Sequence, residues 1–225
     1  MRREPVPGKS NAGFTLLEIL LAIFILAIVM STVYASYTGT LKLVEDTRYS
    51  DYVYGMARNT MKRMIADMES ISPYNSAFRF VSEENDMGEG DFTDLTFLTS
   101  AHLDFFNAHS SGTAVVSYYV EEDGDKEGYL LKRNDILYRG GKEEEEEDLK
   151  EAGFVLCDSL KSLKYLFYDS KGEEYEEWDT ASTIKPGSEG APFLIAVELE
   201  FVNPKDAENP FRFTTRVFVP MAGAR

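Results

Sequence analysis

One acidic side chain, Glu18, lies inside an otherwise uncharged stretch of twenty residues that runs from Phe14 to Val33. A carboxylate in the apolar interior of a membrane costs about 2–3 kcal/mol unless an opposite charge pairs with it. Cleavage of the bond between Gly13 and Phe14 would create an α-amino group four residues before Glu18. That is one helical turn away, on the same chain or on a neighbouring copy. A chain cut at this bond would therefore have a positive charge that neutralises Glu18 once subunits stack.

The rest of the chain offers little of the chemistry that an enzyme needs. Its two histidines, His102 and His109, fall in an expected loop, and its single cysteine, Cys157, lacks the sequence context of a Cys–His pair. No nucleophile-elbow, zinc-protease or phosphate-loop motif is present. A lone cysteine is most often buried and inert. We therefore expect a protein that is not an enzyme, with no catalytic residue and no cofactor.

Two acidic segments were considered as cation sites. Residues 143–148 are six contiguous acids without the interleaved Asn or Gly of a calcium loop, so they predict a solvated acidic loop. Residues 121–125 contain Gly124 between two aspartates, and their oxygens could converge on Ca²⁺. The same residues fall where a hairpin turn is needed. We predict no metal site, and the sequence leaves calcium binding at residues 121–125 as an alternative.

A long helix from Phe14 to about Ser70 is expected to position Glu18. Residues 14–35 are apolar on all sides, and twenty helical residues cover the roughly 30 Å hydrocarbon layer of a bilayer. Over residues 36–70 the apolar side chains thin out to helical spacing, which predicts an amphipathic continuation with one face on a globular domain. Pro73 predicts the helix end. The tyrosines and methionines expected on the core face are Tyr37, Tyr49, Tyr52, Tyr54, Met56, Met61, Met64 and Met68.

The charge distribution separates the two sides of this helix. Three basic residues, Arg2, Arg3 and Lys9, precede the apolar stretch, whereas the chain as a whole has a formal net charge of −16. Positive residues favour the cytoplasmic side, so we expect residues 1–13 in the cytoplasm and residues 71–225 on the other side of the membrane. The acidic excess argues against nucleic acid as a partner.

Residues 71–225 are expected to be rich in strands. After a connecting loop over residues 72–91, the expected strands cover residues 94–99, 114–121, 129–133, 162–169, 193–202 and 211–219. In the last two, acids alternate with apolar residues in one and arginines alternate with them in the other. This pattern predicts a hairpin in which Glu198 and Glu200 meet Arg212 and Arg216. A helix followed only by strands predicts an α+β fold, with an antiparallel sheet packed on the helix.

The segment Gly13-Phe14-Thr15-Leu16-Leu17-Glu18 resembles the processing signature of type IV prepilins and type II secretion pseudopilins. The resemblance implies a pilin-like fold and a single-pass inner-membrane anchor. It implies that a prepilin peptidase removes leader residues 1–13 and methylates the new N-terminal Phe14. It further implies that Glu18 docks the next subunit and that the C-terminal domain is periplasmic.

A second, looser resemblance covers roughly residues 117–199. The residues that carry it are Ser117 to Val120, Tyr129 to Arg133, Leu166 to Asp169, Trp178, Pro192 and Ala196 to Leu199. This series is similar to the J-type minor pseudopilin, general secretion pathway protein J. It implies a place at the tip of a type II secretion pseudopilus, where the partners are I- and K-type minor pseudopilins and the major pseudopilin. The chain departs from this pattern in an insertion around residues 140–148 and in the spacing between Trp178 and Pro192.

The sequence leaves two alternatives open. A minor pilin of a type IV pilus or of a DNA-uptake pseudopilus would share everything through Ser70. A signal-anchored periplasmic binding protein or enzyme would use residues 19–30 as the apolar core of a signal peptide and would be cleaved near Ala35 or not at all. That last alternative leaves Glu18 without an explanation.

Overall fold

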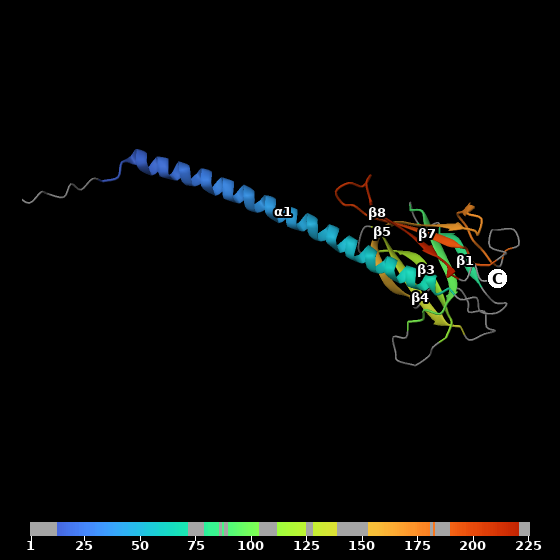
Figure 1. Cartoon of the computed structure of the whole chain (residues 1–225). Helices are drawn as coiled ribbons and strands as arrows, with labels where there is room; N and C mark the ends of the chain where they lie inside the picture. The colour runs from blue at the N-terminus through green and yellow to red at the C-terminus, as the bar shows by residue number, and fades with distance from the viewer. Residues whose placement is uncertain are drawn as a thin grey trace, which may run out of the picture. The chain divides into compact units, whose positions relative to one another are not determined.

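The computed structural model describes residues 13–71, 79–85, 87, 90–103, 112–124, 128–138, 153–180, 182 and 190–220. The chain divides into two compact units, Met1–Asp51 and Tyr52–Arg225. One helix, α1 (Leu16–Glu69), runs through both units, and the strands belong to the second (Figure 1). The strands are β1 (Phe80–Asn85), β2 (Phe92–Thr99), β3 (Ala114–Glu122), β4 (Tyr129–Leu137), β5 (Phe154–Tyr168), β6 (Glu174–Tyr175), β7 (Leu194–Phe201) and β8 (Phe211–Phe218). A helix followed by strands confirms the predicted α+β class.

The part of α1 in the second unit is amphipathic, as predicted. Val53, Ala57, Met64 and Met68 are fully buried and follow one another at helical spacing. The last turn is capped by the sheet, because the Thr99 hydroxyl donates hydrogen bonds to the carbonyl oxygens of residues 67 and 70, both at 3.0 Å. The helix therefore ends where strand β2 supplies partners for its free carbonyl groups.

The expectation that the tyrosines of this helix belong to the core is wrong for three of them. Tyr37, Tyr52 and Tyr54 are at least half exposed. The Tyr52 hydroxyl donates a hydrogen bond to Asp158 at 2.9 Å, and the Tyr54 ring meets the Phe213 ring edge-on at 5.1 Å between centroids. A phenol keeps its hydroxyl near water or a polar partner, so Tyr52 and Tyr54 lie at the edge of the core, whereas Met64 and Met68 are fully buried in it.

The strands form one mainly antiparallel sheet in the order β1-β2-β3-β4-β5-β7-β8, with β6 paired to β5. The long strand β5 serves two ladders: its first half pairs with β4 and its second half with β7, with a register shift between Leu160 and Ser162. A single parallel pairing, Phe92 with Leu163, brings β2 back onto β5. Glycine is required at position 128, next to β5. Its φ is 105°, which other residues rarely adopt, and a Cβ there would lie 3.0 Å from backbone atoms of Ser159 and Leu160.

Strands β3, β4, β7 and β8 lie close to their predicted positions, and the hairpin of β7 and β8 is confirmed. The predicted contact of Arg216 with a glutamate is wrong, because Arg216 lies opposite Ala196. In that hairpin an Arg212 Nη lies 2.5 Å from Glu200 Oε1. Two predictions of strand position are also wrong. Strand β1 lies within the segment predicted as a loop, because its polar residues SEEN hide the strand pattern. Strand β5 begins at Phe154 rather than at residue 162, because the register shift interrupts the alternation of apolar and polar residues. Strand β6, of two residues, was not predicted.

An aromatic cluster forms the core between these strands. The Phe80 ring lies 5.8 Å from Phe97 and 5.7 Å from Phe167, and Phe97 stacks on Tyr118 at 6.2 Å, all between centroids. All four side chains are fully buried. Such pairs contribute roughly 0.5–1.5 kcal/mol each beyond the burial of apolar area.

Candidate processing and docking site

The predicted cleavage site lies in extended chain directly before α1. Gly13, Phe14 and Thr15 precede the first helical residue, Leu16, and all three are exposed, Phe14 by 86%. A Cβ added at Gly13 would meet no atom within 4 Å. The fold therefore does not require glycine at this position, and the bond between Gly13 and Phe14 is open to another protein. Of the predicted leader, residues 1–13, residues 1–12 lie outside the described residues.

Thr15 and Glu18 form a capping box at the start of α1. The Glu18 carboxylate accepts hydrogen bonds from the Thr15 backbone N–H at 2.9 Å and from the Thr15 hydroxyl at 3.1 Å. In return, the Glu18 N–H donates to the Thr15 hydroxyl at 3.3 Å. This reciprocal pattern satisfies N–H groups that have no partner at a helix start, and a negative charge is favoured at that end. Glu18 is thus held by its own helix before any second subunit arrives.

The sequence analysis did not identify this role of Thr15. It named only the future α-amino group of Phe14 as a partner for Glu18. A signal was present, because Thr15-x-x-Glu18 directly before an apolar run is the sequence pattern of a capping box. Cleavage would place the new amine one residue before Thr15, so that a positive charge joins the capping box.

The first part of α1, from Leu16 to Val33, presents apolar surface. Every large apolar side chain from Leu16 to Val33 is at least 48% exposed. Within the described residues, α1 is the one helix long and apolar enough to cross a membrane, by length and composition. Its threonines are satisfied inside the helix: the hydroxyls of Thr32, Thr38 and Thr40 donate to the carbonyl oxygens of Val29, Tyr34 and Ser36 at 2.8–3.0 Å. Internal partners of this kind allow hydroxyl groups to lie in lipid.

The candidates for enzyme chemistry lie in separate places. His102 follows β2, and its Nδ1 lies 3.0 Å from Asp135 Oδ2. Cys157 is 2% exposed in β5, and burial raises the pKa of its thiol to about 12, although hydrogen bonds from Thr60 and Leu131 oppose the shift. His109 lies outside the described residues. The structure therefore brings no histidine to this thiol within the part of the chain that it describes.

The acidic segments gave no cation site in the described part of the chain. Among those residues, no group of three or more His, Cys, Asp or Glu side chains converges. Of the predicted turn, Glu121 forms an ion pair with Lys132 at 2.5 Å. Asp125 and the acidic run at residues 143–148 lie outside the described residues.

A buried ion cluster joins α1 to the sheet, and the sequence analysis missed it. Asp67 of α1 and Arg133 of β4 are both fully buried, and Arg133 Nε lies 2.7 Å from Asp67 Oδ2. The Tyr118 hydroxyl donates to the same carboxylate, as does Arg63 from the preceding turn of the helix. Asp135 extends the cluster, with its Oδ1 3.1 Å from Arg133 Nη1.

The electrostatics of this cluster keep the Tyr118 phenol protonated and Arg133 charged. Burial raises the pKa of Tyr118 well above its usual value, and Asp67 raises it further, so the phenol remains a donor. For Arg133, burial acts against the charge, but the hydrogen bond and charge of Asp67 outweigh burial and raise the pKa. The cluster joins the end of α1 to β3 and β4.

Comparison with known proteins agrees with the N-terminal site. Residues 8–34 match the family model of the prokaryotic N-terminal methylation motif. The chain carries a prepilin-type processing motif. It is also similar in structure to a type IV-like pilin from Thermus thermophilus, at 9% sequence identity and a TM-score of 0.47, over 75% of this chain and 97% of that one. A search among curated proteins found no match.

The matched motif includes Gly13, Phe14 and Glu18. It implies processing by a prepilin peptidase and assembly with other pilins. The capping box thus lies inside the matched segment, residues 8–34.

Proposed function

We propose that this chain is a minor pseudopilin of a type II secretion system, of the J type. In this proposal a prepilin peptidase cuts between Gly13 and Phe14 and methylates Phe14. The mature chain then primes a pseudopilus tip that supports export of folded proteins across the outer membrane. Its role is structural rather than catalytic. Its partners are the I- and K-type minor pseudopilins and the major pseudopilin.

The observation that carries the proposal is the capped acid at the start of an exposed apolar helix. Glu18 lies one turn behind the cleavage site, and the helix that it opens continues without a break to the buried Asp67. A subunit of this kind can lie in a membrane by its first half while its sheet domain stays outside. Positive-inside placement puts residues 1–13 in the cytoplasm and residues 71–225 in the periplasm.

The mechanism of docking follows from the cost of a charge in lipid. A carboxylate at membrane depth costs about 2–3 kcal/mol, and the capping box offsets part of this cost. A growing filament replaces lipid contacts by helix–helix contacts and offers the α-amino group of a neighbouring Phe14. Glu18 then gains an opposite charge that its own capping box cannot supply.

The test of processing is the N-terminus of the mature protein. Mass spectrometry of chain purified from membranes should find N-methylated Phe14 as the first residue. Gly13→Val should block the cut without changing the sheet domain, since no atom lies close to Gly13. A mature chain that begins near Ala35 would instead support a signal-anchored periplasmic protein.

The test of docking is Glu18→Ala, with Glu45→Ala as the matched control. Both remove an exposed acid from α1, but only Glu18 lies in the capping box. We expect Glu18→Ala to leave cleavage largely intact and to abolish co-purification with sibling pseudopilins. Normal assembly of the Glu18→Ala chain would contradict the docking role. Recovery of I- and K-type partners separates the secretion system from a type IV pilus or a DNA-uptake pseudopilus.

A further inference from the structure

The strands β5, β7 and β8 have two faces that differ. Neighbouring residues of a strand point to opposite faces, and directly opposed residues of paired strands share one face. One face is turned to the core: Val217 is buried there, and the Phe213 ring meets the ring of Tyr54 from α1. The other face carries Ala196 and Arg216, which lie directly opposite each other and are at least partly exposed. We call this second face the outer face.

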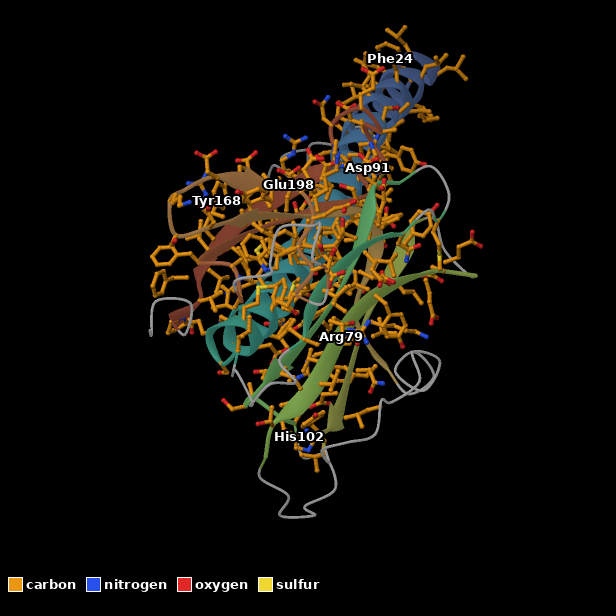
Figure 2. The ribbon with its side chains drawn as sticks, turned by 90° about the vertical axis from the view of Figure 1, so that its right-hand side faces the viewer. Phe24, Arg79, Asp91, His102, Tyr168 and Glu198 are labelled. Atoms are coloured by element: carbon orange, nitrogen blue, oxygen red, sulfur yellow. The ribbon has the colours of Figure 1, made fainter. Side chains whose placement is uncertain are left out.

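An open groove of about 720 Å³ lies over the outer face. Its floor contains Leu166 of β5 and Ala196 of β7, which are directly opposed and apolar. Residues of β1, of the chain before β2 and of the chain after β6 complete its lining. Figure 2 shows Asp91, Glu198 and Tyr168, three of the lining residues, along the upper part of the view. Volumes of about 300–1,000 Å³ are typical of sites that bind a ligand.

The charges in this groove are mostly negative. Lys164 and Arg216 are its two cations, against five carboxylates, which leaves an excess of three negative charges. The five are Glu84, Asp91, Glu176, Glu177 and Glu198. The Lys164 Nζ lies 2.5 Å from Asp91 Oδ2, so these two charges offset each other. Glu84 and Glu176 are exposed, and no ion pair involves them in the part of the chain that the structure describes.

The lysine already in the groove shows which charge its surroundings favour. The hydrogen bond that Lys164 donates to Asp91 raises the pKa of the ammonium group. Partial burial opposes this shift, whereas the charges of Asp91, Glu198 and Glu200 add to it. The groove therefore stabilises a positive charge, and a cation brought by a ligand would meet the same carboxylates.

Apolar side chains adjoin the groove on the outer face. Tyr168, Leu194 and Phe218 are directly opposed across β5, β7 and β8, and Phe218 is 47% exposed. Along β7, Leu194 precedes Ala196 by two residues and Glu198 by four, which corresponds to about 7 and 14 Å. An extended occupant could therefore reach both the apolar row and the carboxylates with residues that are two to four positions apart.

We propose that this groove binds an extended segment of another protein, in which a lysine or arginine lies two to four positions from an apolar residue. The aliphatic part of the basic side chain lies on Leu166 and Ala196, and its charge lies among the carboxylates. The apolar side chain covers the row of Tyr168, Leu194 and Phe218. The inference rests on the sheet alone and holds whether or not the chain is a pseudopilin.

Two other occupants fit the groove less well. The net charge of −16 repels a second copy of this chain, whereas it attracts a basic partner from a distance. A small polyamine has the required charge but no apolar side chain. It would therefore leave Leu194 and Phe218 in contact with water and gain nothing from their burial.

The experiment measures the binding of two labelled, capped peptides to the full chain in micelles of a non-ionic detergent. One peptide contains Phe-Thr-Lys-Thr-Lys, and the other contains Phe-Thr-Glu-Thr-Glu. Fluorescence anisotropy should give an affinity at least about tenfold higher for the lysine peptide, and added salt should reduce the difference. Alanine in place of the phenylalanine of the lysine peptide should lower the affinity by about tenfold.

Two neighbouring acids of β1 separate the groove from the general charge of the chain. Glu84 lines the groove, whereas Glu83 lies outside it, and both are exposed. Glu84→Lys should lower the affinity for the lysine peptide by about tenfold, and Glu83→Lys by less than about twofold. Ala196→Phe keeps the charge, fills the floor and should also lower the affinity by about tenfold. If the fluorescence of Trp178 shows that Ala196→Phe does not fold, the two variants of β1 decide the question.

Three results would overturn the inference. The first is equal binding of the lysine and glutamate peptides. The second is an equal effect of Glu84→Lys and Glu83→Lys, which would mean that the net charge of the chain alone attracts the peptide. The third is an unchanged affinity after the phenylalanine of the peptide is replaced, which would make a simple polyamine a sufficient occupant.

Discussion

The two parts of α1 use the same helical geometry for opposite purposes. From Leu16 to Val33 every large apolar side chain is at least 48% exposed, whereas Val53, Met64 and Met68 are fully buried. The first part lies in a unit without strands, and the second part is covered by the sheet. Apolar residues alone therefore do not tell which helix segment belongs to a core. The difference is made by polar residues, which are few from Leu16 to Val33 and recur on one face beyond that segment.

The polar contacts of the two parts differ in the same way. The first part satisfies its polar groups within the helix, through Thr15, Glu18 and the threonine hydroxyls. The second part satisfies Asp67 through Arg133 and Tyr118, which lie far away in the sequence. In lipid, a helix has to satisfy its polar groups with its own hydrogen bonds. In a protein core, residues distant in sequence can supply the partners.

The largest expected effect concerns thiol reactivity beneath the second part of the helix. Burial raises the pKa of Cys157 to about 12, so at pH 8 only about 10⁻⁴ of it is thiolate, the reactive form. Reactivity should rise as the pH approaches 12. A cysteine introduced at exposed Thr47, in a Cys157→Ser background, should react about a thousandfold faster with a maleimide. Rapid labelling of Cys157 in the folded chain would contradict the burial of this face.

The next effect concerns the ion cluster. Asp67→Asn should destabilise the second unit by about 3–5 kcal/mol, because the buried Arg133 would lose the carboxylate that bonds its Nε and Nη2 and would keep only Asp135 at Nη1. Urea unfolding of the chain in micelles, followed by the fluorescence of Trp178, measures the loss. Asp51→Asn is the control, since Asp51 is an exposed acid on the same helix. A double change, Asp67→Leu with Arg133→Met, should recover much of the stability. An equal loss of unfolding free energy in Asp51→Asn would contradict a specific stabilising role of the ion cluster.

A smaller effect should separate the two parts of α1 directly. Met64→Ala removes a fully buried side chain and should cost about 2–5 kcal/mol of unfolding free energy. Met30→Ala removes a side chain that is 60% exposed and should leave unfolding of the sheet domain unchanged. The same urea titration compares both variants. Equal losses would mean that the first part of the helix also packs against the protein.

The smallest effect should be confined to the first turn. Thr15→Val removes the hydroxyl of the capping box and should weaken the start of α1 by about 0.5–2 kcal/mol. Amide exchange at Leu17 and Glu18 should become faster, while unfolding of residues 52–225 stays the same. An unchanged exchange rate would show that Thr15 does not hold Glu18 in the micelle.

Sequence reasoning was most successful where the signal is local. The helix, the alternation in β7 and β8, and the pairing of their glutamates with Arg212 all follow from residues close in sequence. The capping box was equally local, and its pattern could have been recognised. Strand β1 could not have been recognised from its own residues, because they are mostly polar and resemble a loop. Its strand conformation depends on backbone hydrogen bonds to β2 and Trp178. Pairing Asp67 with Arg133 needs the register of β3 and β4 with the helix, which no local pattern contains.

The sharing of β5 between two ladders has a consequence for how this domain comes apart. Its first half pairs with β4 and its second half with β7, and both halves belong to one continuous strand. Separating the β7–β8 hairpin from the domain would therefore remove the hydrogen-bond partners of the second half of β5. Because the first half of the same strand pairs with β4, that pairing would be weakened too. The sheet should open as one cooperative unit rather than strand by strand, so its protected amides should share a single free energy of opening.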